Sequence, residues 1–562
     1  MYRENKFTTK PLKWVGILLG CWLLPAVAPT LRAQAAERIY LSYDILERSI
    51  SVNSLESYAN QGIIEDDIAP YIQYTKPEYQ EQLRNILLKR LDVSPIAVSQ
   101  FLYTPQAEIL LQRLGQIIKT DSRQPGYRAI RAALILAAAD PQGLTLLNVL
   151  RKFPTPGVRI DLAKGLQIAN ELSTIFERTE KAVNAISQQF ASAATVPVNL
   201  SQLPNLQQPG SFSWRKETIR LNDRSRNRQF LADIYLPIVP ENQPLQTPAK
   251  LIVISHGLAS DRATFAYLAE HLASYGYAVA VPEHPGSNAQ QLQDLLGGRA
   301  NEVSEPGEFI NRPLDIKFLL NELTLLSQNN PLFQGKMNLQ EVGIIGQSFG
   351  GYTALALAGA NLNFDKLQRD CANIENSWNT SLLLQCRVLL LPRSQYNLRD
   401  ERIKAAIAIN PITSSVFGQE GLSQVEIPVM FIAGSADTVA PALTEQLLPF
   451  TWLTTPEKYL VLMENGTHFS TLAETESSVP LPETVLGPDL PLARRYMDAL
   501  SIPFFGAYLG ERSEYKAYLT PSYVQYLSQK TLPLSLVQSL SPEQLRAATQ
   551  RSKSQQTVFP RR

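Results

Sequence analysis

Short apolar runs that alternate with longer helical stretches are the sequence feature that most restricts how this chain can fold. Six such runs occupy residues 251–254, 277–281, 342–345, 403–409, 429–432 and 459–463. Runs that are apolar along almost their whole length are typical of parallel strands buried on both faces. With an antiparallel pair expected before them, at 219–221 and 230–236, they predict an α/β fold with a mostly parallel sheet and helices on both faces. In such a sheet, functional sites lie beyond the carboxyl ends of the strands.

The motif Gly346-Gln347-Ser348-Phe349-Gly350 follows one of these strands directly and precedes the helix-forming run 352–358. Glycines two residues before and after the serine let a strand turn sharply into a helix, which exposes the serine hydroxyl at the edge of the sheet. In a chain with 28 glycines the motif alone would arise by chance about one time in ten. Its place between a strand and a helix therefore carries the prediction that Ser348 is a nucleophile.

A serine hydroxyl needs a neighbouring base, and the base expected for this fold follows the serine in the chain, after an acid. The chain has four histidines, and only His468 comes after Ser348. His468 lies in a glycine-containing loop directly after the strand at 459–463. We therefore predict that His468 is the base.

The acid that orients this histidine is predicted to be Asp437, which follows the strand at 429–432. A carboxylate there would hold one imidazole tautomer and stabilise the imidazolium. Five other acids are alternatives: Asp400, Glu401, Glu426, Glu457 and Glu464. The first four precede strands, and Glu464 is too close in sequence to His468 to approach it from a separate strand end. Asp437 is therefore favoured.

Acyl transfer also needs two donors for the oxyanion, one of them the backbone N–H of the residue after the nucleophile, here Phe349. The second is expected from the loop after an earlier strand, where Gly257 would let the Leu258 N–H point inward. His256 lies in the same loop and is expected to brace it by hydrogen bonding.

Three segments resemble the α/β-hydrolase family of secreted, plasma-type platelet-activating-factor acetylhydrolases. They are Ser255-His256-Gly257-Leu258, Glu283-His284-Pro285-Gly286-Ser287 and Gly346-Gln347-Ser348-Phe349-Gly350-Gly351. The resemblance covers the catalytic domain and implies a Ser348, Asp437, His468 triad with Leu258 and Phe349 as oxyanion donors.

This chain departs from that family at three positions. The family usually has a histidine where Gln347 stands, and an arginine and an aspartate where Pro285 and Gly286 stand. These differences leave the mechanism untouched and bear on whether the substrate is a phospholipid.

The rest of the chain is divided by composition. Residues 36–195 are predicted to form an all-helical domain, with Ser94-Pro95 and Thr104-Pro105 as two of the helix starts. The domain is similar to an N-terminal domain of unassigned function on cyanobacterial hydrolases, through Tyr40-Leu41-Ser42-Tyr43 and Ser49-Ile50-Ser51-Val52. A proline- and glycine-containing linker is expected at 196–212, the catalytic domain at 213–527 and a tail with a short helix at 528–562.

Residues 1–35 are predicted to be an export signal, with a basic start, an apolar stretch and Ala33-Gln34-Ala35 for cleavage. A lipoprotein anchored through Cys21 and a retained membrane anchor are the alternatives. The signal carries five basic residues and one acidic residue, so 47 basic and 50 acidic side chains remain after cleavage. This balance gives no reason to expect nucleic acid as a partner, and charge does not indicate a membrane contact, although one is left open.

Export leaves two cysteines, Cys371 and Cys386, which are predicted to form a disulfide in an oxidising compartment. A pair of reduced, buried thiols is the alternative. Both cysteines lie in an insertion at about 361–402, predicted to form a cap over the acyl pocket.

The sequence therefore predicts an exported serine esterase or lipase-like hydrolase that acts on a small-molecule ester or lipid with at least one apolar group. Neither a cofactor nor a metal is expected. A peptidase or thioesterase with the same triad is one alternative, and a non-catalytic exported binding protein is the other.

Overall fold

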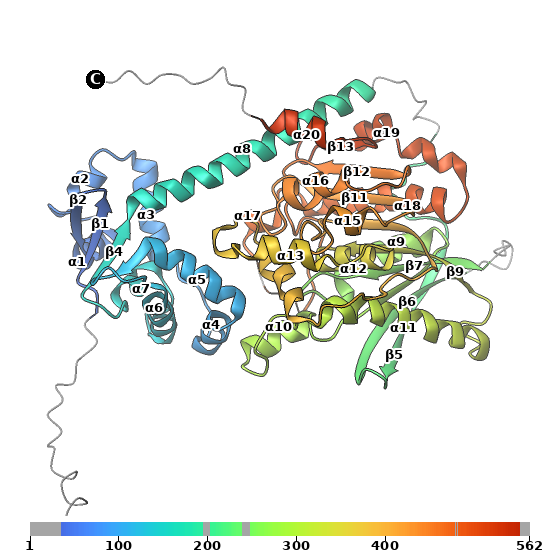
Figure 1. Ribbon diagram of the computed structural model, residues 1–562, viewed down its shortest axis with the longest axis horizontal. Coiled ribbons are helices and arrows are strands. Elements are labelled where there is room, and N and C mark those ends of the chain that lie inside the picture. Colours follow the sequence, from blue (N-terminus) through green and yellow to red (C-terminus); the bar gives the residue numbers. More distant parts are fainter. Residues whose placement is uncertain (1–34, 195–202, 239–247, 478, 480, 551–562) are drawn as a thin grey trace, which may run out of the picture.

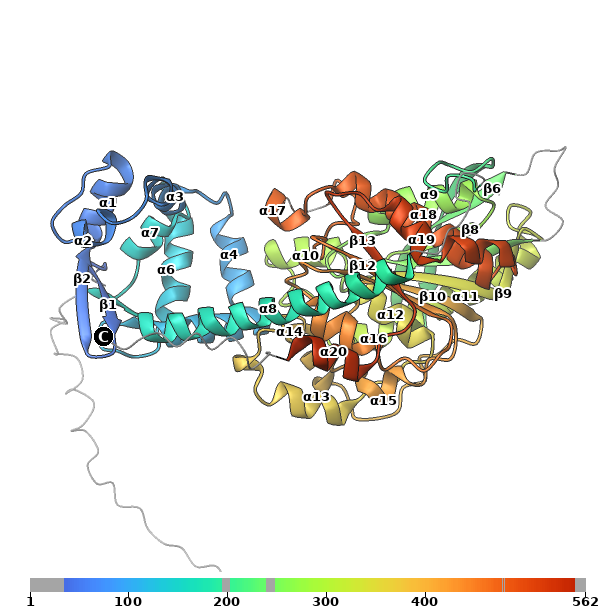
Figure 2. The same ribbon diagram turned by 90° about the horizontal axis from the view of Figure 1, so that it is seen from above.

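The computed structural model describes residues 35–194, 203–238, 248–477, 479 and 481–550. Two units, each built around its own sheet, are joined by the long helix α8 (Leu162–Ala193) (Figures 1 and 2). The predicted export signal, except for Ala35, and linker residues 196–202 lie outside the described residues. Within the described ranges, no helix is long and apolar enough to cross a bilayer.

The larger unit contains a nine-stranded sheet in the order β13-β12-β11-β10-β9-β7-β8-β6-β5. Its strands are β5 (Ser213–Asp223), β6 (Arg228–Ile238), β7 (Ala249–Ser255), β8 (Ala278–Pro282), β9 (Met337–Gln347), β10 (Ile403–Ile409), β11 (Val429–Gly434), β12 (Lys458–Met463) and β13 (Leu534–Val537). Strands β7 to β12 pair in parallel, whereas β5 and β6 form an antiparallel hairpin. The eight predicted strands are confirmed, and the unit has the α/β-hydrolase fold.

Helices cover both faces of this sheet. Helices α9 and α18 contact one another and pack on β8 and β10, whereas α11 and α12 contact one another and pack on β9 (Figure 1). The helices of this unit are α9 (Ala266–Ser274), α10 (Ala289–Leu296), α11 (Glu308–Asn329), α12 (Phe349–Leu357), α13 (Phe364–Cys371), α14 (Leu382–Gln385), α15 (Gly418–Leu422), α16 (Leu448–Phe450), α17 (Glu483–Leu486), α18 (Leu490–Tyr508), α19 (Pro521–Leu527) and α20 (Pro542–Thr549).

The N-terminal unit is not all-helical, which corrects the sequence prediction. It has a four-stranded sheet in the order β2-β1-β4-β3, formed by β1 (Arg38–Tyr43), β2 (Leu46–Ser51), β3 (Ile118–Thr120) and β4 (Gly157–Asp161). Strand β1 pairs in parallel with β4, more than a hundred residues later, and no local pattern reports such a pairing. The strands are also short and largely half-exposed, so their apolar period is weak.

Two helices of the N-terminal unit begin at the predicted caps Ser94 and Thr104. Ser94 accepts a hydrogen bond from Ala97 N at 3.1 Å, and Thr104 accepts one from Ala107 N at 3.2 Å, with proline as the next residue in both cases. The helices before α8 are α1 (Val52–Gln61), α2 (Ala69–Ile72), α3 (Pro77–Leu88), α4 (Pro95–Leu102), α5 (Pro105–Ile117), α6 (Tyr127–Ala139) and α7 (Leu146–Arg151).

Helix α8 lies wholly within the predicted N-terminal domain, but its second half packs in the larger unit. Ala182, Val183, Ile186 and Phe190 in its second half belong to the hydrophobic core of the larger unit. The second half of α8 is therefore part of the hydrolase in structural terms, although it precedes the predicted linker.

The segment after residue 527 is more than a tail. Strand β13 pairs antiparallel with β12, and all four of its residues are buried. Four residues after a proline, three of them apolar, are too short a run to distinguish a strand from a loop by sequence alone. Beyond β13, the predicted short helix is α20, which begins at the cap Ser541.

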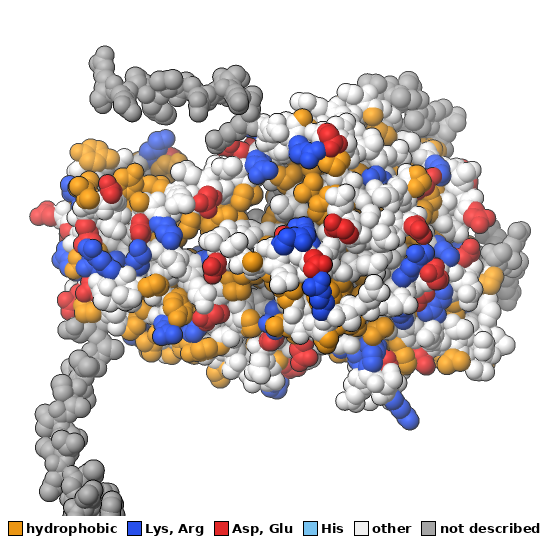
Figure 3. Space-filling view, in the orientation of Figure 1, with side chains coloured by type: hydrophobic (Ala, Val, Ile, Leu, Met, Phe, Trp, Pro, Cys, Tyr) orange, Lys and Arg blue, Asp and Glu red, His pale blue; other side chains and the backbone are white. Residues whose placement is uncertain are grey.

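Charged side chains of both signs are interspersed over the face drawn in Figure 3. This distribution matches the formal net charge of +1 for the whole chain.

Candidate active site

The backbone turns sharply at Ser348, between strand β9 and helix α12. Ser348 has φ 55° and ψ −115°, a backbone conformation with positive φ that residues other than glycine rarely adopt. Its N–H donates to Ile409 O of the neighbouring strand at 2.8 Å. A Cβ added to Gly350 would lie 2.0 Å from Ser255 O, so only glycine fits there. This strained turn places the serine side chain at the carboxyl edge of the sheet, as the motif predicts.

The structure brings Ser348, His468 and Asp437 together in one hydrogen-bonded chain. His468 Nε2 lies 2.8 Å from Ser348 Oγ, and His468 Nδ1 lies 2.7 Å from Asp437 Oδ2. The carboxylate can only accept, so Nδ1 carries the proton and Nε2 is left as the acceptor for the serine hydroxyl. Each of the three residues is at most 6% exposed. The arrangement can therefore deprotonate Ser348 in a site largely screened from water.

Asp437 is fixed by its own backbone neighbours after strand β11. Its Oδ1 accepts hydrogen bonds from Val439 N at 2.8 Å and Ala440 N at 2.7 Å, which leaves Oδ2 for His468. All five competing acids have other partners. Glu464 accepts a hydrogen bond from Ser187, Asp400 pairs with Arg402, Glu401 and Glu426 pair with Arg399, and Glu457 pairs with Lys516.

Two amide side chains to which the sequence analysis assigns no role hold the loop of His468. Gln347 Nε2 donates to His468 O at 3.0 Å, and Asn410 Nδ2 donates to Thr467 O at 3.1 Å. Asn410 Oδ1 also accepts from Gly434 N at 2.8 Å, which links this loop to the end of β11. Gln347 stands inside the serine motif, so its position was a signal, but its partner is a backbone carbonyl that no motif records.

The two predicted oxyanion donors lie on loops that touch each other. A Cβ added to Gly257 would lie 2.2 Å from Gln347 Oε1, so the loop of Leu258 packs directly against the residue before Ser348. Neither the Leu258 N–H nor the Phe349 N–H donates a hydrogen bond to any described residue. Two backbone donors beside the serine therefore remain free to bind an oxygen atom.

A second Ser–His–Asp chain lies behind this loop. His284 Nε2 is 3.0 Å from Ser255 Oγ, and His284 Nδ1 is 3.1 Å from Asp315 Oδ2. All three residues are fully buried, so a substrate has no access to Ser255. Burial, together with the charge of Arg312, holds the pKa of His284 well below its usual range. This chain is a structural support that ties the ends of β7 and β8 to α11.

The predicted cap docks on the loop that carries Asp437. Its residues 361–402 contain α13 and α14, and Thr380 Oγ1 donates to Thr438 O at 2.8 Å and Val439 O at 2.7 Å. The cap also contacts the N-terminal unit, because Trp378 Nε1 donates to Glu171 of α8 at 3.2 Å.

Cys371 and Cys386 form a disulfide within the cap, with their Cα atoms 5.8 Å apart. We expect a variant with serine at both positions to lose about 2–3 kcal/mol of unfolding free energy, as a bridge across a short loop contributes. Thermal and urea unfolding measure this loss. Adding a reductant should lower the stability of the parent protein and leave the double variant unchanged. Equal stability of parent and variant would contradict the role assigned to the bridge.

Comparison with known proteins gives two family matches. Residues 35–161 match a family described as an alpha/beta hydrolase of unknown function (DUF1400), and residues 218–312 match the family of platelet-activating factor acetylhydrolase, isoform II. The first match covers the N-terminal unit up to the end of β4, and the second includes Leu258 but ends before Ser348.

A curated relative of this chain is also a platelet-activating factor acetylhydrolase. The platelet-activating factor acetylhydrolase of Cavia porcellus is 26% identical over 163 residues, which cover 22% of this chain and 35% of that protein. The chain thus matches about a third of the length of this relative.

Proposed function

We propose that this chain, an α/β hydrolase related to platelet-activating factor acetylhydrolases, is an exported serine hydrolase that cleaves carboxylic esters through an acyl-enzyme on Ser348. The observation that carries the proposal is the hydrogen-bonded chain from Ser348 Oγ through His468 to Asp437. It lies beside two backbone N–H groups that have no acceptor among the described residues.

In the proposed first step, Ser348 Oγ attacks the ester carbonyl while His468 Nε2 takes the serine proton. Asp437 stabilises the resulting imidazolium, and the Leu258 and Phe349 N–H groups bind the oxyanion. His468 then gives the proton to the departing alkoxide, which leaves as the alcohol. In the second step His468 deprotonates a water molecule, which attacks the acyl carbonyl. The imidazolium then returns this proton to Ser348 Oγ as the bond between Oγ and the acyl group breaks and the carboxylic acid leaves.

The proposed substrate is a small ester with at least one apolar group, and a short-acyl phospholipid falls within this class. The similarity to platelet-activating factor acetylhydrolases supports this class. An apolar cavity of about 290 Å³ lies between the cap, α8 and α20, and none of Ser348, Asp437 and His468 lines it. Its lining includes Ile175, Trp378, Pro441, Leu443 and Leu448. Pro441 follows Asp437 by four residues, so the cavity adjoins the loop of the proposed acid.

Matched substrates that share one acyl group and differ in the leaving group test this assignment. We expect the ester to be turned over with the highest kcat/KM when rates are divided by active sites titrated with a fluorophosphonate. A higher kcat/KM for the thioester or the amide would indicate a thioesterase or a peptidase. Absence of labelling in folded protein would favour a non-catalytic binding protein.

Export is proposed from the basic and apolar pattern of residues 1–35. A disulfide in the cap is compatible with an oxidising compartment. Mass analysis of the protein recovered outside the cytoplasm should give an N-terminus at Ala36. Recovery in the cytoplasm with residues 1–35 intact would contradict export.

A further inference from the structure

Arg312 on helix α11 is a fully buried cation directly behind the oxyanion donors. We propose that Arg312 is a positioning residue that holds both backbone donors of the oxyanion hole. The proposal rests on the proposed acyl transfer at Ser348, and Arg312 itself does not touch the reacting atoms.

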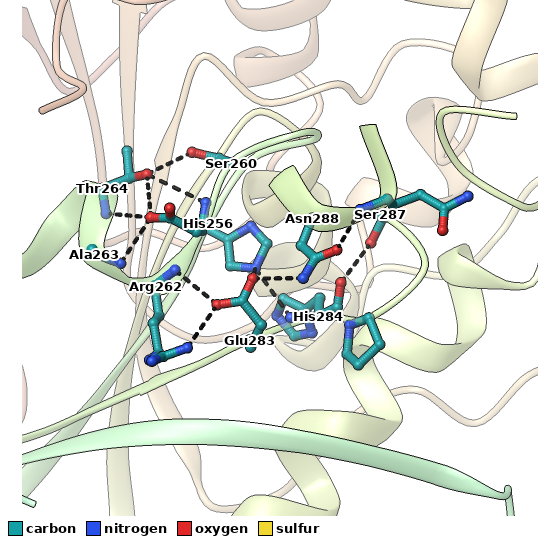
Figure 4. Close-up of polar contacts among 12 residues, drawn as sticks. His256, Ser260, Arg262, Ala263, Thr264, Glu283, His284, Ser287 and Asn288 are labelled. Atoms are coloured by element: carbon teal, nitrogen blue, oxygen red, sulfur yellow. Dashed lines mark hydrogen bonds and ion pairs between the residues drawn. The ribbon is translucent and has the colours of Figure 1, made fainter. Parts of the chain in front are cut away.

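The guanidinium of Arg312 donates to the backbone of the loop that carries Leu258. Its Nη1 donates to His256 O at 2.7 Å, and its Nη2 donates to Gly257 O at 3.1 Å. Its Nε donates to Ser287 Oγ at 2.8 Å, so the loops after β7 and β8 are joined through one side chain. Figure 4 shows these two loops facing each other, with Glu283 between His256, Arg262 and Asn288.

The bond to Gly257 O acts on the proposed donor itself. Gly257 C=O and Leu258 N–H belong to one planar trans peptide group, so they point in opposite directions. A cation that holds the oxygen from behind therefore fixes the direction of the N–H. It also polarises the peptide, which makes the N–H a better donor.

His256 reinforces the same carbonyl. His284 N donates to His256 Nε2 at 3.1 Å, so Nε2 carries no proton, and burial lowers the pKa of His256 to about 4. The neutral ring must then carry its proton on Nδ1, which lies 2.8 Å from Gly257 O. Gly257 O thus accepts from both His256 and Arg312, which gives the predicted bracing role of His256 a specific target.

The same guanidinium also contacts the residue that carries the second donor, Phe349. The Arg312 Cζ lies 4.4 Å from the centroid of the Phe349 ring, a cation–π contact in a fully buried setting. The Phe349 ring also packs against Phe309 at 4.7 Å between centroids. Since the backbone N–H of Phe349 is the other proposed donor, one side chain locates both.

Arg312 carries a charge but forms no ion pair with a described carboxylate. Its neighbour Arg228 pairs with Glu308 and Asp315, whereas no described carboxylate forms an ion pair with Arg312. Burial lowers the pKa of Arg312 to about 9, which leaves the guanidinium charged at neutral pH. A buried arginine that only stabilised the fold would be expected to pair with a carboxylate. Directing its donors at the two carbonyls that precede Leu258 points to a role in positioning this loop.

Substitution of Arg312 by methionine and by lysine tests the proposal. Per titrated active site, we expect R312M to lower kcat by about 10- to 100-fold with KM changed less than about threefold, because the donors act in the transition state. R312K keeps the charge and one donor and should fall between R312M and the parent. The inhibition constant of a trifluoromethyl ketone, whose hemiketal oxyanion needs the same donors, should rise in parallel with the loss in kcat.

Arg402→Lys is the matched control, since Arg402 is a half-buried arginine that bonds Asp400 and Asn321 away from the site. It should leave kcat per site unchanged. A merely structural Arg312 would reduce the number of titratable sites while kcat per site and the ketone constant stay at the parent values, and that result would overturn the proposal. If R312M does not fold, R312K decides between the two outcomes. Full activity of Ser348→Ala would instead refute the proposed function.

Discussion

Replacing Ser348 by alanine is expected to lower ester turnover by about 10⁴-fold or more, because the nucleophile of the proposed acyl-enzyme is lost. The change removes one hydroxyl from a residue that is 6% exposed and already strained, so the fold should not suffer. Turnover of a short-chain aryl ester and labelling by a fluorophosphonate measure the effect. We expect no labelling of the variant and a single labelled serine in the parent.

Ser255→Ala is the informative comparison, since Ser255 also belongs to a Ser–His–Asp chain. Because Ser255 is fully buried, the Ser255→Ala protein should still react with the fluorophosphonate at Ser348, although with lower thermal stability. Labelling that survived in Ser348→Ala and vanished in Ser255→Ala would reverse the assignment.

The parts of the fold that the sequence predicts are those recorded by local pattern. Strands β7, β8, β10, β11 and β12 are almost wholly buried, and β9 is buried from Val342 onward, so each contains an apolar run. The sheet of the N-terminal unit depends instead on the pairing of Arg38 with Gly157 and their neighbours, a contact between distant segments. A weak apolar period and a distant partner together explain why the sequence does not predict this sheet.

The residues of the site also fall into two groups, those that the sequence predicts and those that it does not. Ser348, Asp437 and His468 follow strand ends in a fixed order, so topology is enough to bring them together. Gln347 and Arg312 donate to backbone carbonyls of other loops. Every residue has a backbone carbonyl, so the sequence does not mark which residues accept these hydrogen bonds. Residues of this kind become visible only when the loops have been placed.

Replacing Asp437 by asparagine is expected to lower kcat/KM by about 10³- to 10⁴-fold, through the tautomer of His468. Val439 N and Ala440 N both donate to Oδ1 and would keep the amide oxygen of the asparagine on their side. The amide NH₂ would then face His468 Nδ1 and donate to it. The imidazole proton would be forced onto Nε2, where it faces Ser348 Oγ and prevents the ring from accepting the serine proton.

Glu464→Gln is the matched control, because Glu464 is only four residues from His468 but accepts its hydrogen bond from Ser187. In Glu464→Gln, kcat/KM across the pH range and the rate of fluorophosphonate labelling should both remain near the parent values. In Asp437→Asn, both quantities should fall together. Since labelling requires the same proton transfer as acylation, an Asp437→Asn protein that labelled at the parent rate would show that the imidazole keeps its tautomer without the carboxylate. The acid would then have to be sought elsewhere. A loss confined to Glu464→Gln would identify Glu464 as that acid.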